Sequence, residues 1–190
     1  MSGSHEEGAA GDGRVLVWDA AVRVLHWFLA GLVIFDLVRD DGGWTHRMVG
    51  YAAVVVVVAR LAWAALSSGV AGLRALKPSL TATVSYLRGR APRTLGHDPL
   101  GLWMIWLLWS LVLLLGLTGW MSHLDAFWGD ETIRNVHAWL ADAILVAVGL
   151  HLAGVALMSW HWRENLVAAM FTGHRVTSRR APPPNNRHAK

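Results

Sequence analysis

Hydrophobic residues occur in four long runs along this chain, and charged residues gather between the runs. The runs cover residues 20–38, 46–66, 99–121 and 133–160. Each has close to, or more than, the roughly 20 residues that a helix needs to cross an apolar layer about 30 Å thick. Strands would have to close into a large barrel to do the same, so helices are the expected elements. The pattern predicts an all-α fold, a transmembrane four-helix bundle.

The composition disfavours the alternative, in which the runs are buried core helices of a soluble protein. Hydrophobic residues make up 54% of the 190 residues and charged residues only 16%, and the mean hydropathy is +0.37. A soluble domain would have about a quarter of its residues charged. So little polar surface cannot cover four apolar helices.

Polar residues indicate where the helices and the domain begin and end. Asp19 precedes the first run, and Asp98-Pro99 places a capping side chain and a first-turn proline before the third. Residues 79–90 predict a short helix on the inner membrane surface. Residues 1–14 have no apolar core, so they are expected to be a disordered tail and not a cleaved signal peptide, and residues 176–190 a disordered basic tail. A single transmembrane domain is expected to cover residues 15–175.

The charges between the runs predict how the bundle is oriented. The net charge of +4 and the pI near 10.3 could suggest nucleic-acid binding, but the basic residues collect on one side of the predicted bundle. By the positive-inside rule this side and both termini are cytoplasmic, and the acidic loops lie outside. The partner is then the lipid bilayer, and no nucleic acid is expected. The basic segments contain Arg74, Lys77, Arg88, Arg90, Arg93, Arg163, Arg175, Arg179, Arg180, Arg187 and Lys190, and the acidic loops contain Asp40, Asp41, Asp125, Asp130 and Glu131.

Four of the ten histidines lie inside the predicted helices or in their first turns: His26, His46, His137 and His151. An ionisable side chain within a membrane costs on the order of 3 kcal/mol and usually marks a functional site. For one such histidine, a hydrogen bond to a neighbouring helix would explain the position equally well. The arrangement of all four argues for a shared role. The chain has no cysteine, which removes disulfides, thiolate ligation of haem and iron–sulfur clusters from consideration.

Helix geometry sorts the four histidines into two pairs at two depths. His137 and His151 are fourteen residues apart, so they share one face of the fourth helix and are about 21 Å apart along its axis. The first helix enters from inside, which places His26 at the level of His151; we call these two residues the inner pair. The second helix enters from outside, which places His46 at the level of His137; these two are the outer pair.

Two facing imidazoles at each of two depths suit haem better than the other cofactors considered. A six-coordinate haem iron takes one imidazole on each side, and helix bundles build cofactor sites from facing helices. Zinc would need three or four ligands that converge on one point, and a proton relay would need closer steps. Arg60 lies fourteen residues after His46, at the inner level, where it could bind a haem propionate. Extension of Arg60 to lipid phosphates is the alternative.

The chain resembles the prokaryotic cytochrome b561 family over about residues 15–175. The resemblance is carried by "VWDAAVRVLHW", "HRMVGYAAVVVVVARLAW", "LGHDPLGLWM", "VHAWLADAILVAVGLHLAGV" and "RENLVAAMFTGHR". It implies a di-haem cytochrome of the bacterial inner membrane, with two b haems, one ligated by His26 and His151 and the other by His46 and His137. The chain departs from the family at Asp98, where the "GHNP" pattern has asparagine. Its outer loops are also short, which puts an independent enzymatic activity in doubt.

Three functions are compatible with this resemblance. The first is transmembrane electron transfer between the quinone pool and a periplasmic redox partner such as a cytochrome c, because the acidic outer loops favour a basic protein. The second is a superoxide:quinone oxidoreductase that acts alone, although an anionic substrate would prefer a basic entrance. The third is a membrane-anchor b subunit of a hydrogenase or dehydrogenase. A homodimer or a place in a larger complex is left open.

Overall fold

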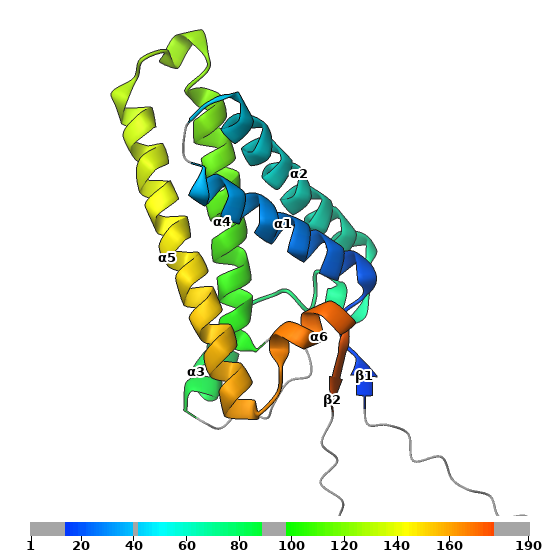
Figure 1. The fold of residues 1–190 in the computed structure, drawn as a ribbon. Helices are drawn as coiled ribbons and strands as arrows, with labels where there is room; N and C mark the ends of the chain where they lie inside the picture. Colours follow the sequence, from blue (N-terminus) through cyan, green and yellow to red (C-terminus); the bar gives the residue numbers. More distant parts are fainter. Residues whose placement is uncertain (1–13, 40–41, 89–97, 177–190) are drawn as a thin grey trace, which may run out of the picture.

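Four long helices dominate the computed structural model, which describes residues 14–39, 42–88 and 98–176 (Figure 1). They are α1 (Ala20–Val38), α2 (Trp44–Leu66), α4 (Pro99–Met121) and α5 (Glu131–Trp162). Each is long and apolar enough to cross a membrane, so the predicted four-helix membrane protein is confirmed. Helices α1 and α4 have the predicted bounds, whereas α2 begins two residues before the predicted run and α5 extends two residues beyond it at each end.

The shorter elements lie between and beside these helices. The expected short helix is α3 (Leu80–Leu87), and a further helix, α6 (Leu166–Thr172), follows α5. Two 3-10 turns cover Gly69–Ala71 and Asp125–Phe127. Strands β1 (Arg14–Leu16) and β2 (His174–Val176) form an antiparallel pair, which the sequence pattern did not predict. Most of the two predicted tails, together with Asp40, Asp41, Arg90 and Arg93, falls outside the described residues.

Side-chain caps fix the first turns of α1, α4 and α5, whereas α2 follows Gly43 without one. The Asp19 carboxylate accepts a hydrogen bond from the Val22 N–H at 2.8 Å, and Asp98 accepts one from Gly101 at 2.6 Å. Asp130 accepts from the Thr132 N–H at 2.7 Å. Because Asp130 lies ahead of the apolar run, its cap adds a polar first turn to α5 that hydropathy alone did not predict.

The long helices pack in chain order, α1 on α2, α2 on α4 and α4 on α5 (Figure 1). The buried core lies mainly between α2, α4 and α5. Gly116 lets α4 pack closely on α2, because a Cβ at this position would lie 2.3 Å from Val54 Cγ2 of α2. Gly116 is therefore a helix–helix contact, in keeping with the small residues that let membrane helices approach each other.

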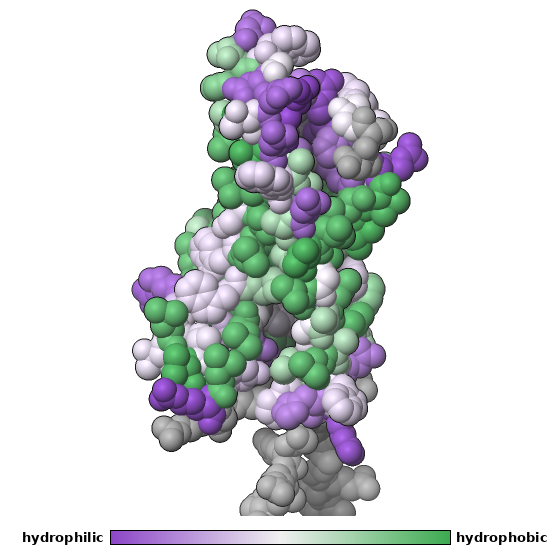
Figure 2. Space-filling model, turned by 90° about the vertical axis from the view of Figure 1, so that its left-hand side faces the viewer, coloured by the Kyte–Doolittle hydropathy of each residue, from purple (hydrophilic) through white to green (hydrophobic). Residues whose placement is uncertain are grey.

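Both ends of the described chain lie at the same end of the bundle. Strands β1 and β2 pair there, and the Gly173 carbonyl accepts hydrogen bonds from Val17 at 2.8 Å and Trp18 at 3.1 Å. The outer surface of the bundle exposes many large apolar side chains, as expected where helices face lipid. Figure 2 shows apolar residues over the middle of one face, with polar residues gathered toward the two ends.

Candidate functional site

The structure brings the four membrane histidines together in two pairs. His26 of α1 faces His151 of α5, with the ring centroids 6.5 Å apart and the ring planes at 53°. His46 of α2 faces His137 of α5, with the centroids 6.1 Å apart and the planes at 80°. The partners are those expected from depth, and α5 contributes one histidine to each pair.

The spacing within each pair fits a metal ion between the rings. A metal–imidazole nitrogen bond is about 2 Å long, and the nitrogen lies about 1 Å from its ring centre, so two imidazoles on opposite sides of one ion have centroids about 6 Å apart. The observed 6.1 and 6.5 Å match this separation. Among the described residues there is no cluster of three or more His, Cys, Asp or Glu side chains suited to a metal ion. The spacing of each pair therefore suits one metal ion between two imidazoles, and haem ligation itself stays a prediction.

Thr118 of α4 lies in hydrogen-bond contact with His137. The Thr118 hydroxyl donates to the Leu114 carbonyl at 2.9 Å, and its oxygen lies 2.8 Å from His137 Nδ1. When the hydroxyl proton points to this carbonyl, Nδ1–H of His137 is the donor in the second contact. Nε2 of His137 is then unprotonated and able to bind a metal. Gly119 leaves room for this ring, because a Cβ there would lie 3.4 Å from His137 Cε1.

Asp36 of α1 lies beside the other outer histidine. Its Oδ1 is 3.3 Å from His46 Nδ1, and the exposed fractions of the two side chains are 19% and 24%. Both of these atoms are buried, and their contact lacks hydrogen-bond geometry, so it is a charge contact between the carboxylate and the imidazole. Each histidine of the outer pair therefore has an oxygen within 3.3 Å of Nδ1.

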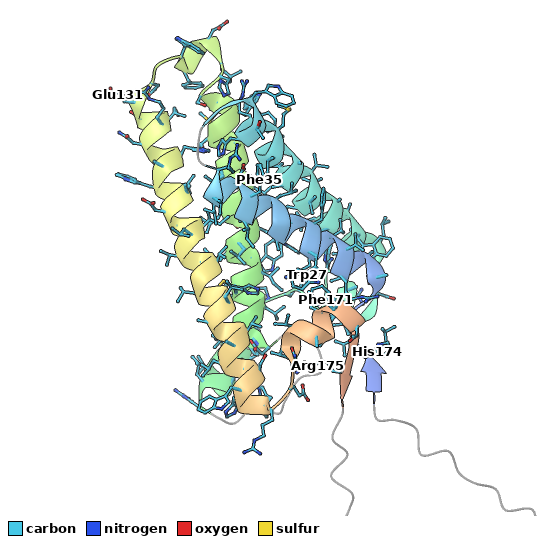
Figure 3. All side chains as sticks on the ribbon, viewed as in Figure 1. Trp27, Phe35, Glu131, Phe171, His174 and Arg175 are labelled. Atoms are coloured by element: carbon cyan, nitrogen blue, oxygen red, sulfur yellow. The ribbon has the colours of Figure 1, made fainter. Side chains whose placement is uncertain are left out.

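The inner pair has a different setting. Like His46 Nδ1, His26 Nδ1 is buried without a hydrogen-bond partner among the described residues, but no carboxylate contact to His26 is found there. Next to His26, Trp27 stacks on Phe171 of α6 with centroids 4.2 Å apart, and Figure 3 shows these two side chains side by side. The Arg23 guanidinium donates to the Phe171 carbonyl. Helix α6 thus covers α1 at the end of the bundle where the inner pair lies.

Arg60 of α2 is inside the protein and does not extend to the lipid surface. Only 6% of the residue is exposed. Its guanidinium donates to the Ala71 carbonyl at 3.3 Å and lies 5.7 Å from the centre of the Trp109 ring. In this structure Arg60 therefore does not extend to lipid phosphates, which was the alternative. Contact between Arg60 and a haem propionate stays a prediction.

Asp36 and Thr118 are the two site residues that the sequence did not single out. Asp36 is the only carboxylate within the first apolar run, and an ionisable side chain in a membrane helix is by itself a functional signal. Thr118 gave no comparable signal, because a hydroxyl in a membrane helix commonly bonds its own backbone four residues back.

Fold and geometry define an integral membrane protein with histidine pairs at two depths of one helix bundle. The sequence model of the family described as prokaryotic cytochrome b561 matches residues 17–173, so the chain belongs to that family. It is accordingly a membrane b-type cytochrome, a haem protein of electron transport. No match was found among the curated proteins.

Proposed function

We propose that the chain holds two b haems and transfers electrons across the bacterial inner membrane between the quinone pool and a periplasmic redox partner. His26 and His151 would hold the inner haem, and His46 and His137 the outer one. The observation that carries this proposal is the pair of ring separations, 6.5 and 6.1 Å, at two depths of α5. Bound there, each haem iron would take up and release single electrons between its ferric and ferrous states.

The protein contributes ligation, spacing and exclusion of water. Two imidazoles at each depth leave no position for oxygen or another substrate on the iron, which favours electron transfer over oxygen chemistry. Fourteen residues of α5 separate His137 from His151, so the two sites are about 21 Å apart along the helix. Arg60, buried on α2, supplies a positive charge at the inner level where it would neutralise a haem propionate.

The orientation of the bundle follows from the charges at its two ends. Arg74, Lys77 and Arg88 lie in the connection between α2 and α4, on the same end as β1 and β2. Asp125 and Asp130 lie at the opposite end, in the connection between α4 and α5, and Glu131 follows them as the first residue of α5. The positive-inside rule then places both termini in the cytoplasm and the acidic end in the periplasm.

The acidic end favours a basic periplasmic partner such as a small cytochrome c. We expect the purified cytochrome, supplied with a quinol, to reduce a basic cytochrome c at a rate that falls roughly tenfold or more from low salt to high salt, because salt screens the steering charges. Stopped-flow absorbance of the cytochrome c measures this rate. An acidic cytochrome c is the control and should react slowly at every salt concentration. Equal rates for both partners, independent of salt, would contradict the proposed docking, and failure of quinol to reduce the haems would contradict the quinone link.

A further inference from the structure

We infer that Asp36 is a positioning residue for the outer haem, which holds the His46 ligand through Nδ1 and lowers the reduction potential of that haem. The inference rests on the function proposed above and adds a residue that acts through a ligand. It also distinguishes the two haems, because the inner pair has no carboxylate at the corresponding position among the described residues.

The first step is the geometry around the carboxylate. Asp36 comes from α1, while His46 and Gly50 lie one turn apart on α2. Oδ1 lies 3.3 Å from His46 Nδ1, and a Cβ at Gly50 would lie 3.5 Å from Oδ2. The carboxylate thus rests against one face of α2, between the imidazole and the glycine that gives it room. Removal of the carboxylate would free the imidazole to rotate.

The second step is the proton on His46. The negative charge of an ionised Asp36, 3.3 Å from Nδ1 of His46, favours the tautomer that carries the proton on Nδ1. Nε2 is then free to bind iron. A carboxylate beside the outer nitrogen of a ligating histidine fixes the ring and makes it a stronger electron donor to the metal. A stronger donor and a nearby negative charge both favour the ferric state, and the reduction potential falls.

The third step is the contrast with the inner pair. His46 Nδ1 has the Asp36 carboxylate 3.3 Å away, whereas no carboxylate contact to His26 is found among the described residues. The buried charge at the inner level is the positive one of Arg60, which favours the ferrous state. The outer haem should therefore have the lower potential of the two, and Asp36 should contribute to that difference.

The test is a spectroelectrochemical titration of the haem-loaded protein and its variants. Asn keeps the shape and one acceptor oxygen of Asp, so Asp36→Asn removes the charge with little change in packing. At a fixed ambient potential we expect the reduced-to-oxidised ratio of the outer haem to rise about tenfold, which is a shift of about 59 mV for one electron. The reduction step of the outer haem is identified as the one that is missing from the titration of His46→Ala. The inner step should not move.

Two further variants separate charge from packing. Asp142 of α5 is an exposed carboxylate within another membrane helix. Asp142→Asn should leave the reduction potentials of both haems unchanged. Asp36→Glu restores the charge, and its outer step should lie near the wild-type value. If Asp36→Asn fails to retain the outer haem, retention by Asp36→Glu supports the inference and loss from both variants overturns it. An unshifted outer step in Asp36→Asn, or an equal shift in Asp142→Asn, also overturns it. The haem content of the wild-type protein distinguishes failure of this inference from failure of the proposed function. If the wild type holds two haems per chain and the potential does not move in Asp36→Asn, only the inference about Asp36 fails.

Discussion

Replacing His151 with alanine will lower the haem content of the purified protein from two haems per chain to one, and replacing His46 will remove the other haem. The reason is that each pair draws its histidines from two helices, α1 and α5 or α2 and α5, with ring centroids 6.5 or 6.1 Å apart. One imidazole remains at the damaged site, but an iron held from one side alone binds more weakly. The intact site lies about 21 Å away along α5 and should keep its haem.

The measurement is haem quantification as the pyridine haemochrome, combined with a redox titration. The two variants should retain haems with different potentials, since they lose different sites. His161→Ala is the matched control, because His161 lies on α5 and is exposed outside both pairs. This variant should keep two haems. Full haem content in both His151→Ala and His46→Ala would refute the assignment of ligands.

Electron transfer across a vesicle membrane will fall to the rate of protein-free vesicles in either single-haem variant. An electron has to cross the bundle through both sites, one toward each end, and a variant with one haem has no site toward the other end of the bundle. Vesicles with a trapped reductant and external ferricyanide measure the rate. Wild-type protein should restore rapid reduction of the external acceptor.

The remaining haem in each variant provides the control for correct folding and insertion. In His151→Ala the outer haem should still exchange electrons with reagents on the outer side. In His46→Ala the inner haem should still exchange them on the opposite side. A variant that has lost one haem yet carries electrons across the membrane at the wild-type rate would contradict a path through both sites.

Hydropathy predicted the four membrane helices because each is a long apolar run, and the bounds of α1 and α4 agree with it. It missed the first turn of α5 because Glu131 and Thr132 are polar and are held by the Asp130 cap. It could not predict the ribbon of β1 and β2 either, since three-residue strands show no periodic pattern.

The histidine partners could be predicted because depth along a membrane helix follows from residue number and orientation. The side chains beside them could not. Contact between Asp36 and His46, or between Thr118 and His137, depends on how each helix is rotated about its axis and how closely α1 and α4 approach their neighbours. Packing at residues such as Gly116 sets that rotation and distance, and one apolar run gives no information on it.

The central claim is that two haems are clamped by the paired imidazoles, and the most direct measurement is the reduced-minus-oxidised visible spectrum of the purified protein with haem quantification. The account predicts low-spin b-type bands and two haems per chain. A colourless protein after expression with ample haem, or a single high-spin haem per chain, would contradict it.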